Sequence, residues 1–186
     1  MSYRTTCAGL VTRLRDLISD PVVPTGGRKP VFSNDQLQTA LDRRRQVVRY
    51  LSLDPEEFRL PGGGVAYLDY YAGLGDWEAD AKLYDSAYNE LTPAASDLET
   101  GHWTFASDTL PPVYLIGKTY DLYAAAADVL EKWAAAKKLE FTFGPGSGQF
   151  VRSQQHAMIL TTAAQYRAQQ RPEIAHLTRS DINAGC

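Results

Sequence analysis

The residue types that most often carry acid–base or metal chemistry are few and scattered in this chain of 186 residues. His102, His156 and His176 are isolated, and none has a cysteine or carboxylate at the spacing of a metal site. Cys7 and Cys186 lie near opposite ends of the chain and form neither a metal-binding nor a redox motif. We interpret both cysteines as free thiols and predict no metal site.

The glycine-rich and acidic segments also lack complete motifs. Residues 144–148 read GPGSG, but the Lys-Ser/Thr pair that a phosphate-binding P-loop requires does not follow them. The chain has no G-x-S-x-G nucleophile elbow, and its acidic middle has no EF-hand calcium loop. We therefore predict no catalytic residue, metal ion or cofactor, and a protein that is not an enzyme. An enzyme with a site that matches no motif stays an alternative.

Length and composition bound the class of protein. The chain has room for one domain, or one domain with a substantial insertion, and with 44% hydrophobic residues it can bury a sizeable core. Its longest apolar runs are too short to span a bilayer, and its first residues lack the apolar centre of a signal peptide. We expect a soluble protein made in a reducing cytoplasm.

Charge is distributed unevenly along the chain, whose net charge is −3. Residues 1–53 hold nine basic and four acidic groups, whereas residues 54–108 hold twelve acidic groups and two basic ones. The acidic block is therefore predicted to form a separate surface or subdomain. A protein that contacts nucleic acid over its whole surface would be strongly basic, which disfavours that class.

Two amphipathic helices are predicted in the basic first third. The first spans residues 6–19, with Arg13, Arg15 and Asp16 on its exposed side, and ends where Pro21 disfavours helical backbone at Asp20. Its apolar stripe consists of Leu10, Leu14, Leu17 and Ile18.

The second helix is predicted to begin at Ser33, which can form a capping box with Gln36. We interpret the arginines of this helix either as a solvated face or as a contact with an acidic partner surface or DNA. The predicted buried side consists of Leu37, Leu41, Val48 and Leu51, and the predicted arginine cluster of Arg43, Arg44, Arg45 and Arg49.

The middle of the chain predicts strands, and a third helix follows. Residues 62–108 contain short aromatic, β-prone pieces between turns, which predicts an antiparallel β insertion of four or five short strands. The helix is predicted over residues 118–138 and is apolar on nearly all sides, so it is covered either within the bundle or by another subunit. The candidate interface residues are Tyr123, Ala126, Ala127, Leu130 and Trp133.

A β-hairpin is predicted before the last helix. Phe141 and Phe143 alternate with polar residues, GPGSG supplies a turn, and Phe150 and Val151 continue after it. From Ser153 the apolar residues recur at helical spacing.

The expected fold class is therefore mainly α (α+β): a helical bundle with an antiparallel β insertion at about 62–108 and a β-hairpin before the last helix. Residues 1–172 form its one domain. Residues 173–186 are poor in apolar residues and are predicted to be an extended C-terminal tail that needs a partner to become ordered.

The order and spacing of these segments resemble the head–tail adaptor, or connector, proteins of long-tailed bacteriophages and related gene-transfer particles. The resemblance covers most of the chain. It is carried by the opening helix ending at Asp20, FSNDQLQTALDRRRQVV at 32–48, SDLETGHWTF at 96–105, TYDLYAAAADVLEKWA at 119–134 and FGPGSGQFVRSQQ at 143–155.

The resemblance implies a structural protein of the virion neck, made in the bacterial cytoplasm and lacking enzyme activity. Such proteins form a ring, usually of twelve copies, beneath the portal protein, and they extend the channel through which double-stranded DNA passes. The next neck protein, a stopper or tail terminator, docks on the ring, and no membrane is involved. The resemblance implies that the tail docks to portal, and the candidate contacts are Ile174, Leu177, Arg179, Asp181 and Ile182.

A small DNA-binding or packaging accessory protein is the alternative function. The predicted arginine cluster and the last helix, which is rich in glutamine and arginine and has no acidic residue, motivate this interpretation.

Overall fold

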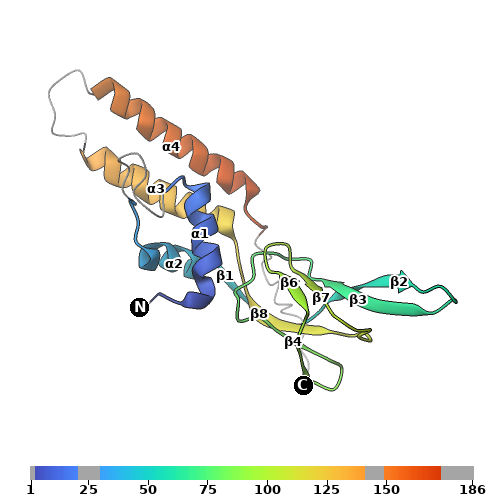
Figure 1. Ribbon diagram of the computed structural model, residues 1–186. Coiled ribbons are helices and arrows are strands. Elements are labelled where there is room, and N and C mark those ends of the chain that lie inside the picture. The colour runs from blue at the N-terminus through green and yellow to red at the C-terminus, as the bar shows by residue number, and fades with distance from the viewer. Residues whose placement is uncertain (1–2, 21–29, 141–148, 173–186) are drawn as a thin grey trace, which may run out of the picture.

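The computed structural model describes residues 3–20, 30–140 and 149–172, which form a helical part and a β-rich part side by side (Figure 1). The described residues form four α-helices and two four-stranded antiparallel sheets. The fold is therefore α+β, and the prediction of a mainly α fold is wrong.

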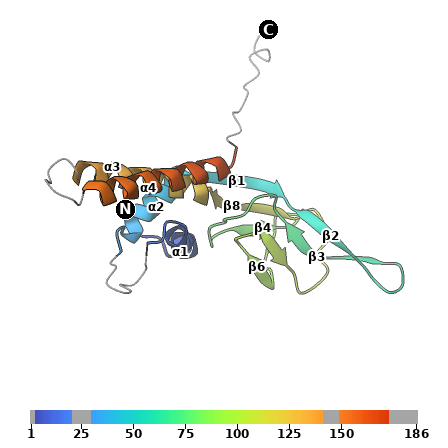
Figure 2. The ribbon, with the colours of Figure 1, turned by 90° about the horizontal axis from the view of Figure 1, so that it is seen from above.

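The helical part is built on two long antiparallel helices, α3 (Leu122–Glu140) and α4 (Gln149–Gln169), which lie side by side in both ribbon views (Figures 1 and 2). A short 3-10 helix, η1 (Thr5–Cys7), leads into α1 (Ala8–Leu17), and α1 and α2 (Asn34–Arg43) pack against α3. Apolar side chains from all four α-helices form one core.

The first helix is close to its predicted bounds but differs at one charged residue. Leu10, Leu14 and Ile18 are buried, as their spacing predicts. Arg15, however, is buried rather than exposed. Its guanidinium pairs with Asp20 and donates hydrogen bonds to the Phe32 carbonyl (2.7 Å) and Asn34 Oδ1 (2.8 Å), which compensate for burying the charge.

The strands form two sheets. The first has the order β1 (Arg45–Ser52), β8 (Tyr114–Tyr120), β4 (Lys82–Tyr84), β5 (Glu90–Leu91). The second has the order β2 (Asp54–Arg59), β3 (Val65–Tyr71), β7 (His102–Thr104), β6 (Ala95–Asp97). A second core of aromatic and aliphatic side chains, with Tyr70, Trp77 and Trp103 buried at its centre, joins the sheets.

Two predicted helices are partly strands. The capping box at Ser33 is present, but α2 ends at Arg43, and Arg45–Ser52 form β1. The β-branched side chain of Val48 favours a strand, and pairing with Gly117 of β8 completes it. Similarly, α3 begins only at Leu122, because the backbone before it belongs to β8.

The hairpin and insertion predictions also need correction. Phe150 and Val151 lie in the first turn of α4 and not in a strand, whereas residues 141–148 lie outside the described residues. Five strands lie within 62–108 and pair antiparallel, but the sheets also take β1, β2 and β8 from outside that range. The β-rich part therefore spans residues 45–120, between α2 and α3, and is larger than the predicted segment 62–108.

One hairpin extends beyond the rest of the molecule. Strands β2 and β3, with the turn between them, reach outward past the other strands in both views (Figures 1 and 2). We call residues 54–71 the hairpin arm. All six residues of β2 are exposed.

Candidate functional site

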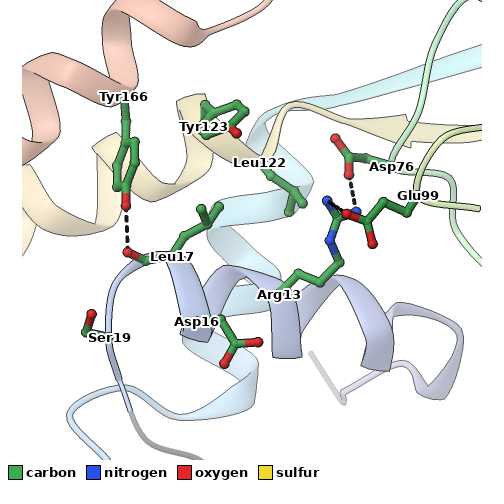
Figure 3. A pocket seen from close by; sticks show the side chains of 9 residues that line it. All are labelled: Arg13, Asp16, Leu17, Ser19, Asp76, Glu99, Leu122, Tyr123 and Tyr166. Atoms are coloured by element: carbon green, nitrogen blue, oxygen red, sulfur yellow. Dashed lines mark hydrogen bonds and ion pairs between the residues drawn. The ribbon is translucent and has the colours of Figure 1, made fainter.

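A pocket lies at the junction of the helical and β-rich parts (Figure 3). It has a volume of about 670 Å³ and takes residues from α1, α3, α4 and the loops near Asp76 and Glu99. We call it the junction pocket. It is lined by Arg13, Asp16, Leu17, Ser19, Asp76, Glu99, Leu122, Tyr123 and Tyr166.

Ion pairs at the junction pocket hold the two parts together, and a hydrogen bond beside them joins two of the helices. Arg13 of α1 pairs with Asp76 and with Glu99 (2.8 Å), which come from the β-rich part (Figure 3). The Tyr166 hydroxyl of α4 donates to the Leu17 carbonyl (2.8 Å) at the end of α1. Burial raises the pKa of Asp76, and the charges of Arg13 and Arg171 oppose that shift. Among the described residues, its lining offers carboxylates and hydroxyls but no histidine, cysteine or lysine.

A second polar cluster, centred on the fully buried carboxylate of Glu78, lies at the same junction. Glu78 accepts hydrogen bonds from Thr6 Oγ1 (2.5 Å) and Tyr120 Oη (2.6 Å). The charged nitrogens of Arg4 (3.2 Å) and Lys118 (3.4 Å) also lie beside it. Burial alone would raise the pKa of Glu78, but these partners outweigh burial and lower it to about 2. The cluster therefore stabilises the attachment of the N-terminal segment to β8.

Replacing Glu78 with glutamine should destabilise the protein at pH 7 by about 2–3 kcal/mol, because the depressed pKa measures a net attraction for the ionised form. A lowered pKa contributes stability above about pH 4.5, and this contribution is lost as the pH falls towards 2. The difference in stability between wild type and Glu78→Gln, measured by urea unfolding, should therefore shrink steadily from pH 5 to pH 2.

The matched control is Glu90→Gln. Glu90 pairs with Lys82 (2.8 Å) on the exposed surface, so its removal should leave stability nearly unchanged at every pH. If the two variants behaved alike, Glu78 would not be the anchor of this junction.

The structure disperses the predicted arginine cluster. Arg44 at the end of α2 forms a two-pronged contact with Asp128 of α3 (2.7 and 2.9 Å) and is therefore part of the helical packing. Arg43, Arg45 and Arg49 are exposed, but Arg43 ends α2 whereas the other two lie in β1. The four arginines do not form one helix face.

The predicted subunit interface on α3 is mostly covered within the chain itself. Ala126 and Ala127 are fully buried, and Leu130 is 4% exposed. Trp133 is half-buried and packs edge-to-face on Phe32. Only Tyr123 is exposed to a substantial extent, at 38%. The apolar character of α3 is accounted for by α1, α2 and α4, so a neighbouring subunit is not required to cover it.

The predicted portal-binding residues of the tail, Ile174, Leu177, Arg179, Asp181 and Ile182, lie outside the described residues, as does Cys186. Cys7 is buried as a free thiol, consistent with its interpretation.

The hairpin arm is the surface that the sequence interpretation missed. It carries large apolar side chains in solvent: Phe58 is 57% exposed, Leu60 45% and Val65 40%. Its charged residues Asp54 and Glu57 form no ion pair within the described part of the chain. The run DPEEFRLPGGGV contains the signal, since an acidic and apolar stretch around a glycine turn is typical of an exposed hairpin.

Within residues 3–20, 30–140 and 149–172, no group of three or more histidine, cysteine, aspartate or glutamate side chains is placed to hold a metal ion. No helix in the same ranges is long and apolar enough to cross a membrane. Neither a protein-family model, nor a curated protein, nor a solved structure matches the chain.

Proposed function

We propose that this chain is a subunit of a head–tail adaptor ring in a long-tailed bacteriophage or a related gene-transfer particle. The ring would lie beneath the portal at the virion neck, extend the channel for double-stranded DNA, and receive the next neck protein. In this role the chain acts as a structural component and catalyses no reaction.

The hairpin arm is the observation that carries the proposal. Phe58, Leu60 and Val65 are exposed together on one projecting element, and grouped exposed apolar side chains are typical of a protein–protein contact. The antiparallel pairing of β2 with β3 gives the arm a defined direction. A chain that builds a stable body and extends an apolar arm from it is suited to assembly.

The junction clusters support the same interpretation. The contacts of Glu78 and of Arg13 fix the arm-bearing sheets on the helical part, so force on one part is transmitted to the other. An adaptor needs such coupling because portal and tail load it from opposite sides.

The proposal is tested with portal rings purified from a phage that encodes this chain. When they are mixed with the full-length protein, the rings should gain a regular second layer. Native mass spectrometry would give the number of bound subunits, and electron microscopy would show the layer. The tail is proposed to anchor the layer, so deleting residues 173–186 should abolish stable association while leaving the circular dichroism spectrum helical.

Two outcomes would contradict this proposal in different ways. If the intact protein never associates with portal rings, the adaptor function is wrong. If the truncated protein binds as well as the intact one, the function stands and the portal contact belongs to residues 1–172.

A further inference from the structure

Strands β1 and β2 follow one another along the chain and are both edge strands, each at the end of its own sheet (Figure 2). An edge strand leaves a row of backbone groups and side chains available to another chain. Here the available surface is long, because β1 has eight residues, β2 has six, and only Leu53 separates them.

The two edges carry opposite charges. Strand β1 has Arg45 and Arg49 and no acidic residue, whereas β2 has three acidic residues and only Arg59 as a basic one. Within the described residues, Arg45, Arg49, Asp54 and Glu57 are exposed and form no ion pair. Their charges are therefore not used to hold the fold together.

Both edges also expose apolar side chains next to these charges. On β1, Val47 is 53% exposed and Tyr50 is 55% exposed. On the hairpin arm, Phe58 and Leu60 are exposed next to the acidic residues, as Val47 and Tyr50 are next to the arginines of β1. Charged side chains alone would be enough to protect an edge strand from aggregation. A mixture of apolar and charged side chains is instead typical of a contact surface.

We propose that the acidic hairpin arm of one subunit docks along the basic β1 edge of a second copy of the same chain. Arg45 and Arg49 of one copy face Asp54 and Glu57 of the other, and Phe58 covers Val47. This contact would join neighbouring subunits of the proposed ring. It rests on the proposed function only where it requires the subunits to close into a ring.

The charges favour a second copy of the chain as the binding partner. Each edge finds, on the same chain, an exposed surface of opposite charge with apolar side chains at its centre, so the two are complementary without a further protein. The register shift between Val48 and Leu51 places an extra residue in β1 and interrupts that edge, and Pro55 in β2 has no backbone N–H to donate. Both limit a continuous backbone ladder between copies, so side chains carry the contact.

Charge reversal tests the contact in the full-length protein. The variants are Arg45→Glu/Arg49→Glu on β1 and Asp54→Arg/Glu57→Arg on β2, none of which removes an ion pair of the fold. Each should weaken self-association at least about tenfold, measured by analytical ultracentrifugation over a concentration series. An equimolar mixture of the two variants should recover self-association, because every contact then joins opposite charges again. A chain that carries all four changes should also self-associate like the wild type.

Lys132→Glu is the control, since Lys132 is exposed on α3 and forms no ion pair in the described chain; it should leave association unchanged. Circular dichroism of all variants verifies that they fold. The contact is overturned if the wild type associates and neither reversal weakens it, or if both weaken it and the mixture does not recover. It is also overturned if the wild type stays monomeric at millimolar concentration and on portal rings.

The mass of the assembly separates this inference from the proposed function. A ring that obeys the charge-reversal pattern supports both. A dimer that obeys the pattern but never binds portal keeps the contact and removes the adaptor function. A ring on portal that ignores the pattern keeps the function and overturns the contact.

Discussion

Replacing Ala126 with glutamate should destabilise the folded protein by roughly 3–5 kcal/mol. Ala126 lies in the middle of α3 with no exposed surface, among apolar side chains contributed by the other helices. A carboxylate there would either be buried without a partner or force the helices apart. Urea unfolding followed by circular dichroism at pH 7 measures the loss directly.

Ala135→Glu is the matched control, because residue 135 lies in the same helix and is exposed. Glutamate forms helices almost as well as alanine, so this variant should unfold at nearly the wild-type urea concentration. The two variants also test the subunit interface that the sequence predicts for this face of α3. If Ala126→Glu kept full stability and only prevented self-association, that face would be a subunit interface after all.

Replacing Gly75 with alanine should cost about 3 kcal/mol of stability, although the change adds a single methyl group. A Cβ atom at this position would lie 2.0 Å from the Glu99 carbonyl oxygen. The backbone cannot move away freely, because the Gly75 carbonyl accepts hydrogen bonds from Thr119 Oγ1 (2.5 Å) and from Arg171 (2.8 Å). Relieving the clash would therefore break contacts that hold α4 against the sheets.

Gly73→Ala provides the comparison two residues away, since a Cβ there would meet no atom within 4 Å. Thermal unfolding of the two variants under identical conditions should show a large loss for residue 75 and almost none for residue 73. Equal effects would mean that the loop near Glu99 yields easily and that the junction is not rigid.

Local signals in the sequence predicted only part of this fold. The Ser33–Gln36 capping box and the stripe through Leu10 and Leu14 act within a few residues, and both are present. The end of α2 was missed because Leu37, Leu41, Val48 and Leu51 fit helical spacing. What makes Val48 part of a strand is pairing with β8, which lies far along the chain and leaves no trace in the local pattern.

The junction pocket could not be predicted for the same reason. Arg13 meets Asp76 and Glu99 only after the helical and β-rich parts have packed together, and no motif spans such separations. The hairpin arm is different, since its glycine turn and acidic strand are local. What the sequence does not reveal is that the fold leaves Phe58 more than half exposed.

Arg171 has a mechanical consequence for whatever residues 173–186 bind. Its backbone N–H donates to Asp121 (2.7 Å), and its guanidinium contacts Thr119 (2.7 Å), Gly75 and Asp76. A pull on the chain beyond residue 172 would therefore be taken up by β8 and by the loop at Gly75 and Asp76, and not by α4 alone.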